Sequence, residues 1–377
     1  MSAIKRFLNK DLLGVRFSVL LLTSVFVLSI FMGAFMWWAD PWLYYRVDEN
    51  RDYWLDGAFV SAGLIKNTQY DAAVIGSSYF QDFRMHWFRD KLGVNPVNLT
   101  IPGLDNNETG LLLDALIDKE QAESLYICLT PYTFRQSLEK GRIPQYLLDD
   151  IVWNDYQYWF AYEAWVKFLP LDIATWALNL LDSEALNGYA SMRNAEQLGN
   201  EMNRYSYDSS LAWKSAESNS QVNSLSDEER LLEFEVMTSN FDSYIENMDF
   251  LRTPRIQYYF ILPPHSALHW HLSRISGMYD VYTAFRTYII EKLTVFNNVV
   301  IIDCQIMGEI AELDHYRDTT HYDLNIQEKI IDIIADGSLN VNAENIKQHN
   351  MALAGLINSF CIANEEQLKL TGLYVQQ

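Results

Sequence analysis

The strongest hydrophobic pattern in the chain is an uninterrupted apolar segment near its amino terminus. Residues 17–38 read FSVLLLTSVFVLSIFMGAFMWW, 22 positions without a charged side chain. As an α-helix such a segment is about 33 Å long at roughly 1.5 Å per residue, which matches the hydrocarbon core of a bilayer. The pattern therefore predicts a transmembrane helix over residues 17–38.

The charges beside this segment are asymmetric. Four basic residues precede it, against one acidic residue: Lys5, Arg6, Lys10, Arg16 and Asp11. Positive charge collects on the cytoplasmic side of membrane proteins. We therefore expect residues 1–16 to be cytoplasmic and residues 39–377 to form one domain outside the cytoplasm.

Aromatic residues mark the end of the apolar segment, at Trp37, Trp38, Trp42, Tyr44 and Tyr45. Tryptophan and tyrosine are enriched where a membrane protein crosses the interface with water. The alternative is a cleaved signal peptide, whose apolar region is normally shorter and ends at small residues. The aromatic end favours an anchor that is retained.

Beyond the anchor, short apolar runs alternate with amphipathic segments. Five runs predict strands, at residues 71–78, 95–101, 123–130, 255–263 and 297–304. Helical patterns cover residues 107–119, 232–250, 280–296 and 322–335. Continuous apolar runs are typical of strands covered on both faces. The alternation predicts an α/β fold, with a mainly parallel five-stranded sheet between layers of helices.

Residues 143–251 interrupt this rhythm and are interpreted as a helical insertion between the third and fourth strands. The insertion begins with an aromatic-rich stretch, DYQYWFAYEAWVKFLPL at residues 155–171, and becomes polar over residues 214–230. Its aromatic side chains either line a substrate groove or pack the insertion onto the core. Packing is the commoner role for aromatic residues at helical spacing.

The overall charge and the cysteines exclude several classes of function. The chain has 28 Lys and Arg against 49 Asp and Glu, a formal net charge of −21. A field of that sign repels phosphate backbones, so we expect no nucleic-acid partner. The cysteines, Cys128, Cys304 and Cys361, are too few and too dispersed for a disulfide framework. They also lack the spacing of a metal site, and we expect neither a metal nor a cofactor.

The candidate chemistry begins where the first predicted strand ends, in the stretch DAAVIGSSYFQDF at residues 71–83. Small residues at a strand-to-helix turn leave a hydroxyl exposed at the carboxyl end of a sheet, where α/β folds place their sites. Ser78 is therefore a candidate nucleophile, provided that a histidine from elsewhere reaches it.

The chain offers such a histidine in the stretch RDTTHYDL, where Asp318 and His321 stand three residues apart. A carboxylate so placed holds the imidazole in one tautomer and stabilises its charged form. The other ring nitrogen is then free to take a proton from a serine. Each residue also has an ordinary structural role, with Ser78 as a turn residue and Asp318 as a helix cap.

In order and spacing, these motifs resemble the SGNH (GDSL-like) hydrolase superfamily. The resemblance is to its membrane-anchored branch, which includes proteins of polysaccharide O-acetylation and of teichoic-acid D-alanylation. IGSS at residues 75–78 matches the first block, NLTIPGLDNNE at 98–108 the second and DTTH at 318–321 the last. The resemblance implies a flavodoxin-like three-layer sandwich, with Ser78, Asp318 and His321 catalytic. It also implies that the backbone N–H groups of Ser78 and Gly103 form the oxyanion hole.

Two departures from the superfamily pattern are visible. Ser77 stands where most members carry an aspartate, and the asparagine expected after the third strand is absent from ICLTPYTF at residues 127–134. Thr130 is the candidate to replace that asparagine. Losing one side-chain donor from an oxyanion hole typically costs about 2.7–4 kcal/mol of transition-state stabilisation.

A histidine-rich stretch, ILPPHSALHWH at residues 261–271, follows the fourth predicted strand and reaches the same edge of the sheet. His265 is a candidate for contact with an acyl group or a sugar. Tyr132, Arg317 and Tyr322 are further candidates for the rim of the site. His269 and His271 have no acidic or cysteine partners nearby that would complete a metal site.

The resemblance implies a serine acyl-esterase or acyltransferase that acts on an extracytoplasmic polysaccharide or another cell-envelope glycan. The corresponding place is the cytoplasmic membrane of a bacterium, with the bulk of the chain in the periplasm or outside the cell. The resemblance further implies a membrane-bound O-acyltransferase as partner. The alternative is a non-catalytic accessory or glycan-binding subunit of such a complex.

Overall fold

The computed structural model describes most of the chain. The described residues are 2–47, 57–135, 141–148, 152–169, 206–218, 224–246, 248, 251 and 254–374. The insertion predicted for residues 143–251 lies partly outside these ranges. Its described helices are the 3-10 turn η2 (Gln145–Leu147), α5 (Val152–Trp159), the π-helical turn η3 (Ala164–Phe168), α8 (Ser209–Ser218) and α9 (Asp227–Glu246).

The centre of the fold is one mostly parallel sheet with the strand order β2-β1-β3-β4-β5-β6. The strands are β1 (Ala72–Ile75), β2 (Pro96–Asn98), β3 (Ser124–Cys128), β4 (Gln257–Leu262), β5 (Val299–Asp303) and β6 (Asn340–Val341). The first five are parallel and coincide with the five runs predicted from the sequence. The α/β class and the mainly parallel sheet are thus confirmed.

The predicted number of five strands was wrong, because the structure has a sixth. Helix α12 (Leu324–Asp336) ends at Gly337, whose φ of 68° turns the chain back toward the sheet. The two residues of β6 then pair antiparallel with β5, Val341 with Ile301 and Asn340 with Ile302. A two-residue strand has no periodicity for a sequence pattern to reveal.

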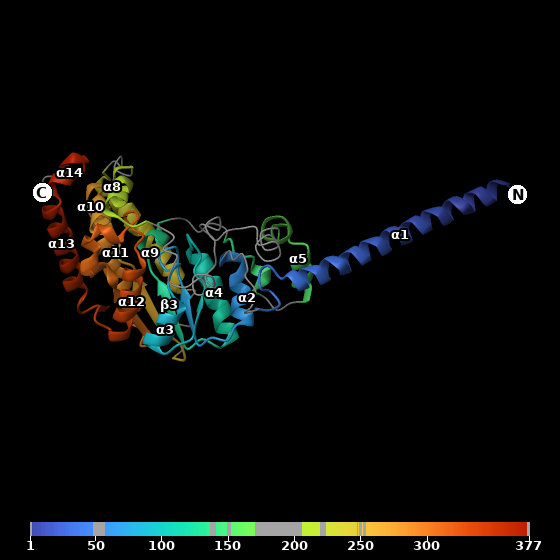
Figure 1. Ribbon diagram of the computed structural model, residues 1–377, viewed down its shortest axis with the longest axis horizontal. Coiled ribbons are helices and arrows are strands. Elements are labelled where there is room, and N and C mark those ends of the chain that lie inside the picture. Colours follow the sequence, from blue (N-terminus) through green and yellow to red (C-terminus); the bar gives the residue numbers. More distant parts are fainter. Residues whose placement is uncertain are drawn as a thin grey trace.

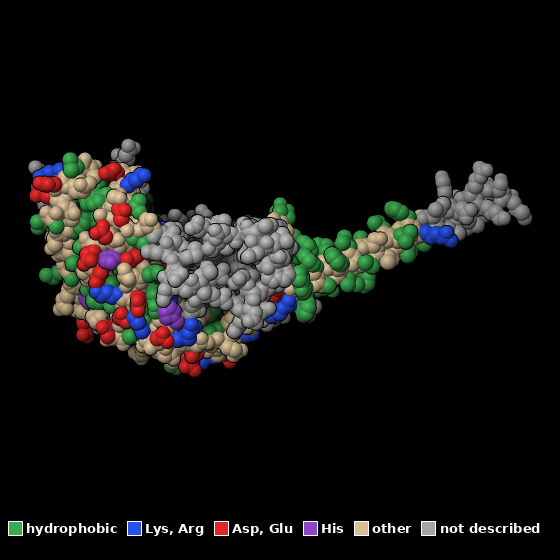
Figure 2. Space-filling view, viewed as in Figure 1, with side chains coloured by type: hydrophobic (Ala, Val, Ile, Leu, Met, Phe, Trp, Pro, Cys, Tyr) green, Lys and Arg blue, Asp and Glu red, His purple; other side chains and the backbone are tan. Residues whose placement is uncertain are grey.

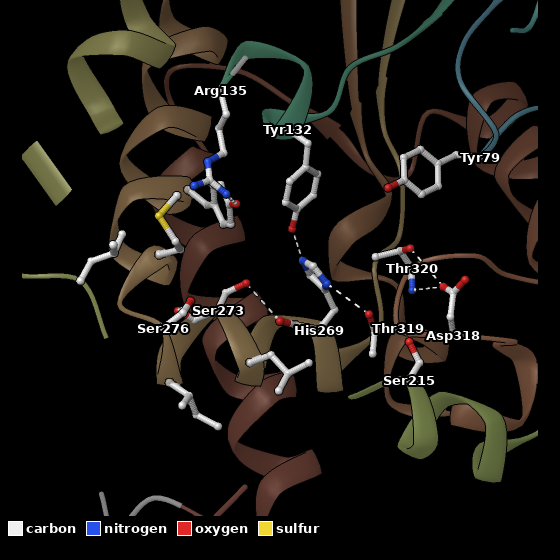
Figure 3. A pocket seen from close by; sticks show the side chains of 15 residues that line it. Tyr79, Tyr132, Arg135, Ser215, His269, Ser273, Ser276, Asp318, Thr319 and Thr320 are labelled. Atoms are coloured by element: carbon white, nitrogen blue, oxygen red, sulfur yellow. Dashed lines mark hydrogen bonds between the residues drawn. The ribbon is translucent and has the colours of Figure 1, made fainter. Parts of the chain in front are cut away.

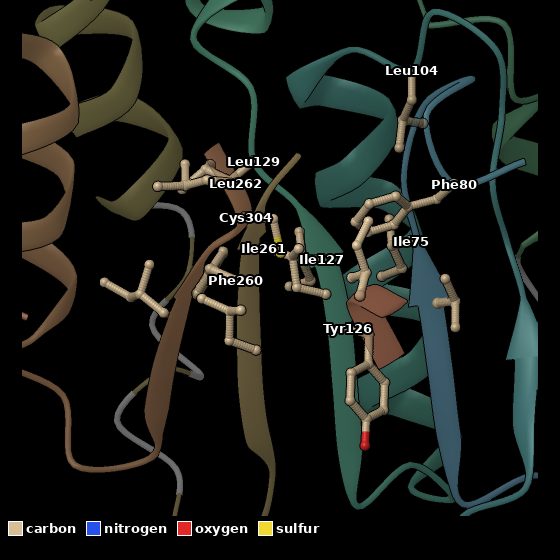
Figure 4. Close-up of a cluster of buried hydrophobic side chains, with 14 of the residues drawn as sticks. Ile75, Phe80, Leu104, Tyr126, Ile127, Leu129, Phe260, Ile261, Leu262 and Cys304 are labelled. Carbon is tan, nitrogen blue, oxygen red and sulfur yellow. The ribbon is translucent and has the colours of Figure 1, made fainter. Parts of the chain in front are cut away.

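The core lies against both faces of the sheet. The side chains of β1 are fully buried at all four positions, and Ile127, Phe260 and Ile261 of β3 and β4 are almost as inaccessible. Figure 4 shows Ile75, Ile127, Phe260 and Ile261 with Phe80 and Cys304 filling the space around the strands. This burial explains why the strands read as continuous apolar runs.

Helices cover the sheet in pairs. Helix α3 (Met85–Leu92) packs against α12, and α9 packs against α11 (Met278–Leu293). Helix α2 (Gly57–Asn67) packs against α4 (Asn106–Lys119), and α10 (Ala267–Ile275) packs against α11 and against α13 (Ile346–Ala363). The chain closes with the short helix α14 (Glu365–Leu370).

A buried ion pair fastens the carboxyl-terminal helices to the sheet. Arg286 of α11 lies 2.5 Å from Asp303 at the end of β5, and both side chains are inaccessible to solvent. Nδ1 of His349 on α13 lies 3.0 Å from the same carboxylate. Because an unpaired buried charge is costly, the pair holds α11, β5 and α13 in one arrangement.

Helix α1 (Ser2–Ala39) projects from the rest of the molecule (Figure 1). Its segment Gly14–Ala39 is long and apolar enough to cross a membrane, and only a small share of it is buried within the protein. Figure 2 shows hydrophobic side chains gathered along α1, whereas acidic and basic side chains are spread over the globular part. The expected N-terminal apolar helix is therefore present.

A buried carboxylate joins α1 to the globular part. Asp40 is inaccessible to solvent, and its side chain accepts hydrogen bonds from the backbone N–H groups of Tyr44, Tyr45 and Arg46. The hydroxyl of Tyr158 on α5 donates to the same carboxylate at 2.9 Å. Burial raises the pKa of Asp40 above its ordinary value, although these hydrogen bonds oppose the shift.

The Asp40 contacts correct one expectation about the aromatic residues. Trp37 and Trp38 are exposed, as an interfacial belt requires, but Trp42 and Tyr44 are buried. The turn around Asp40 directs Trp42 inward, where its ring packs 5.6 Å from that of Tyr158. This part of the predicted belt is a small core that connects α1 to α5.

We expect Asp40→Ala to destabilise the protein, because it leaves the Tyr158 hydroxyl and several backbone donors buried without their acceptor. A buried donor left unpaired costs about 1–3 kcal/mol. Thermal unfolding of the full chain in detergent measures the effect, with Asp90→Ala on the exposed face of α3 as the control. Equal unfolding temperatures for the two variants would contradict this role of Asp40.

Candidate active site

The first part of the site is the turn at the end of β1. A Cβ atom at Gly76 would lie 2.9 Å from Cβ of Cys128 and 2.9 Å from the ring of Phe80, so only glycine fits there. The Gly76 carbonyl accepts a hydrogen bond from the backbone N–H of Ile101 at 2.9 Å. Gly76 thus brings the chain after β1 and the chain after β2 side by side.

The turn places Ser78 opposite a histidine from the other end of the chain. Oγ of Ser78 lies 2.8 Å from Nε2 of His321, although the two residues are 243 positions apart. Nδ1 of His321 lies 2.7 Å from Oδ2 of Asp318. These distances join serine, imidazole and carboxylate in the order of a nucleophile, its base and the group that orients the base.

Asp318 is held by its own loop. Its Oδ1 accepts hydrogen bonds at 2.8 Å from the backbone N–H groups of Thr320 and His321. Burial alone would raise the pKa of Asp318, but the hydrogen bond and the charge of His321 hold this pKa well below its ordinary value. The carboxylate is therefore ionised at neutral pH, as a group that stabilises an imidazolium must be.

Tyr79 was missed by the sequence analysis, although it directly follows Ser78. Its ring stacks on that of His321, with centroids 5.2 Å apart and planes at 29°. On the other side, the ring of Tyr79 lies 5.2 Å from that of His265. Tyr79 thereby restricts the rotation of the His321 ring about its bond to Cβ.

The loop after β2 carries the second candidate oxyanion donor. Gly103 has a φ of 67°, a conformation that favours glycine, and both Gly103 and Ser78 lie two residues beyond the paired positions Ile101 and Gly76. Neither the Ser78 nor the Gly103 amide donates a backbone hydrogen bond to another described residue. The hydrogen bond from Ile101 to Gly76 continues the parallel pairing of β2 with β1. This pairing brings the Ser78 turn and the Gly103 turn to the same edge of the sheet.

Arg142 is a positioning residue that the sequence did not reveal. Its guanidinium donates to the carbonyls of Pro102 and Gly103 at 2.8 and 3.0 Å, and to Glu108 at 2.7 Å. Burial would raise the pKa of Glu108, but the bonds from Arg142 hold it below its ordinary value. Glu108 also completes a capping box with Asp105 at the start of α4, so Arg142 ties the glycine turn to that helix.

Behind the triad lies a buried histidine cluster. His265 is almost fully buried and packs among the rings of Tyr79, Tyr132 and His269. Burial lowers the pKa of His265 well below its ordinary value, and it lowers that of His269 to about 4. Both imidazoles are therefore neutral at physiological pH. The Tyr132 hydroxyl is hydrogen-bonded to Nε2 of His269.

A cavity of about 520 Å³ adjoins the triad on the side of Asp318. Figure 3 shows Tyr132 and His269 at its centre, Tyr79 and Asp318 at one side and Arg135 at another. Arg135 is paired with Glu233 at 2.8 Å, which neutralises the cationic side chain in the wall. Apart from the Asp318 carboxylate and the neutral His269 imidazole, the lining consists of hydroxyl groups and apolar side chains.

Two residues predicted to contact substrate do not line this cavity. Thr130 is buried, and its carbonyl accepts hydrogen bonds from Thr133 in the turn after β3. His265 lies behind Tyr79 and Tyr132, which line the cavity in its place. Both residues follow a strand, which is why they are candidates for substrate contact, but the structure buries both of them.

Of the three residues predicted for the rim of the site, two lie next to it and one does not. Tyr132 lines the cavity, and Nε of Arg317 lies 3.6 Å from Oδ2 of Asp318. Tyr322 is buried and forms an antiparallel bridge with Tyr316. Tyr132 and Arg317 are thus next to the site, whereas Tyr322 is part of the buried support of the loop that carries Asp318 and His321.

Side chains that could bind a metal ion are not clustered in the described part of the chain. No group of three or more His, Cys, Asp or Glu side chains there has an arrangement that could hold a metal ion. His271 is hydrogen-bonded through Nε2 to the Leu373 carbonyl and through Nδ1 to Cys361, which accounts for both ring nitrogens.

Comparison with known proteins does not identify a family for this chain. No protein-family model matches this sequence, and no curated protein matches it.

We expect Asp318→Asn to reduce stability in a pH-dependent way. A carboxyl group whose pKa is lower in the folded state stabilises the fold fully above its unfolded pKa, near 3.8, and loses that contribution as the pH falls further. The contribution of the Asp318 carboxylate to the free energy of unfolding, relative to Asp318→Asn, should therefore be fully present at about pH 5. It should shrink below pH 3.8.

Urea unfolding at a series of pH values measures this difference, with Asp90→Asn as the control for loss of a surface carboxylate. A difference that stays the same from neutral pH to pH 3 would show that Asp318 does not carry the pKa shift attributed to it.

Proposed function

We propose that this chain is a membrane-anchored serine acyl-esterase or acyltransferase of the SGNH type, acting on acyl groups of an extracytoplasmic polysaccharide or cell-envelope glycan. The observation that carries the proposal is the contact from Ser78 through His321 to Asp318, at 2.8 and 2.7 Å. The order of these residues along the chain, with Gly103 between them, is the order of the superfamily motifs.

The sheet supports the same assignment. Its strands β2-β1-β3-β4-β5 have the order of a flavodoxin-like doubly wound sheet. We propose that the helices form the outer layers of a three-layer sandwich, with right-handed crossovers. In such sheets ligands bind outside the carboxyl ends of the strands where the strand order reverses, here between β1 and β3. Ser78 follows β1 at that point.

In the proposed mechanism, Nε2 of His321 takes the proton of Ser78 while Oγ attacks an ester carbonyl. The backbone N–H groups of Ser78 and Gly103 stabilise the oxyanion. Collapse of this intermediate breaks the bond to the leaving alcohol, which takes the proton from His321, and leaves an acyl-serine. His321 then deprotonates water or a sugar hydroxyl, which attacks the acyl-serine and restores Ser78.

The membrane helix favours transfer over hydrolysis as the physiological reaction. A tethered catalyst lies beside integral membrane proteins, and the partner proposed from the resemblance is a membrane-bound O-acyltransferase that supplies the acyl group. The acceptor would be a glycan hydroxyl near the membrane. The hydroxyl-rich cavity, in which Asp318 is the one carboxylate of the lining, is compatible with a sugar or acyl group.

A second candidate is a non-catalytic, glycan-binding accessory of the same kind of complex. The absence of the third-block asparagine favours it, because Thr130, the residue that could replace it, is buried. The oxyanion hole would then have only its backbone donors.

A chromogenic acetyl ester distinguishes the two candidates. For the enzyme, Ser78→Ala and His321→Ala of the full chain in detergent should each lower kcat/KM by about 10³-fold or more, because a triad fails as a unit. Ser218→Ala, on the exposed surface of α8, should leave turnover unchanged. Wild-type turnover no faster than that of Ser78→Ala would favour the accessory.

A topology reporter tests the proposed location in a bacterial cytoplasmic membrane. An enzyme that matures only outside the cytoplasm, fused after Gln377, should be active, because the basic residues before α1 keep the amino terminus inside. Replacing Lys5, Arg6, Lys10 and Arg16 by glutamate should lower that activity. A wild-type fusion active only in the cytoplasm would reverse the proposed orientation.

A further inference from the structure

A second element of the structure packs along the apolar part of α1. A Cβ atom at Gly33 would lie 2.8–2.9 Å from the indole ring of Trp159, so α1 and α5 touch where α1 has no side chain. Two residues further along α1, the ring of Phe35 stacks on that of Trp165, with centroids 5.4 Å apart. Both contacts lie within Gly14–Ala39, the segment long and apolar enough to cross a membrane.

This element presents apolar side chains on its outer side as well. Its inner residues, Tyr158, Ala161 and Ala164, are buried against α1 and α2. Its outer residues Tyr156, Phe160, Tyr162 and Val166 are 46%, 48%, 69% and 55% exposed. Exposed apolar side chains also occur together on α9, at Leu231, Leu232 and Val236, but that group includes no exposed aromatic residue.

We propose that α5 and η3 form an interfacial element, residues 152–169, whose outer face lies in the headgroup region of the bilayer that α1 crosses. The partner of this face is therefore lipid. The inference rests on the proposed membrane anchoring of α1, and it adds a second membrane contact made by the globular part itself.

The contacts with α1 indicate how deep the interfacial element lies in the bilayer. Phe35 lies four residues before Ala39, the end of the apolar segment, which is about 6 Å along a helix. Trp165, stacked on Phe35, must lie at a similar depth. Interfacial elements bury their apolar side about 5–10 Å into the headgroup boundary, the region where tryptophan and tyrosine are enriched.

The charges of the element limit how deeply it enters. Glu163 is exposed and Asp155 is half-buried, and neither carboxylate belongs in the hydrocarbon core. Asp155 and Glu163 against Lys167 give the element a net charge of −1, and this charge and the chain's net charge of −21 repel anionic lipids. Attraction must therefore come from the apolar and aromatic side chains. Contact should therefore be as strong with zwitterionic lipid as with anionic lipid, and insensitive to salt.

Photocrosslinking of the full chain tests the contact directly. The photoreactive residue p-benzoylphenylalanine replaces Tyr162 of the element, Phe26 of the membrane-crossing segment, or Tyr374 near the carboxyl terminus. Each protein is reconstituted into vesicles of phosphatidylcholine and phosphatidylethanolamine that carry a clickable acyl chain. All three positions are exposed aromatic residues, at 69% for Tyr162, 66% for Phe26 and 39% for Tyr374.

We expect the lipid adduct at position 162 to form within about threefold of the yield at position 26, and at least about tenfold above that at position 374. The yield at position 162 should be the same at low and high salt. An adduct at 162 with a second copy of the chain, or a yield no higher than at 374, would overturn the inference. Because position 26 reports the anchor and no ester turnover is measured, failure of the inference is distinguishable from failure of the proposed enzyme.

A variant tests whether the contact with α1 sets the depth. Gly33→Leu puts a side chain where Trp159 lies, so it should lower the lipid adduct at position 162 severalfold. Gly14→Leu is the matched control, because a Cβ atom there meets no atom within 4 Å. Equal yields in the two variants would overturn the geometry proposed here.

Discussion

The close approach of the chain at Gly76 to the neighbouring strand is the constraint on which the candidate site depends. Cys128 and Phe80 leave no room for a side chain there, so β1 can end only at glycine. The same residue accepts the N–H of Ile101, which draws the loop after β2 to the loop after β1. The Ser78 hydroxyl and the glycine turn at Gly103 therefore reach the edge of the sheet together, where the loop that carries His321 closes over them.

Three carboxylates organise the loops around this edge and at the end of the apolar helix α1. Asp318 accepts two backbone N–H groups of its own loop, Asp105 caps α4 beside the glycine turn, and Asp40 accepts three backbone N–H groups after α1. Each fixes irregular backbone that neither a helix nor a strand would hold. In this acidic chain, some carboxylates therefore stabilise loops by accepting backbone hydrogen bonds, and not all of them are solvated surface groups.

The sequence predicted what depends on local periodicity. The apolar segment before Ala39, the five parallel strands and the main helices follow from runs of side chains, and the motif order suggested that Ser78 and His321 would meet. The remaining features depend on contacts between distant residues. Arg142 looks like a surface arginine until Glu108 and Gly103 are beside it, and His265 looks accessible until Tyr79 and Tyr132 cover it. The two-residue strand β6 has no pattern at all.

The junction around Asp40 has a further consequence for motion. A flexible linker would let a tethered domain swivel and sample a hemisphere above the membrane, but here the turn after α1 is held by the Asp40 carboxylate and by Tyr158. For a chain anchored in a bilayer, this leaves lateral diffusion and rotation about the membrane normal as the main rigid-body motions. If α1 is anchored as we propose, the globular part therefore meets its surroundings at a height and tilt that α1 sets.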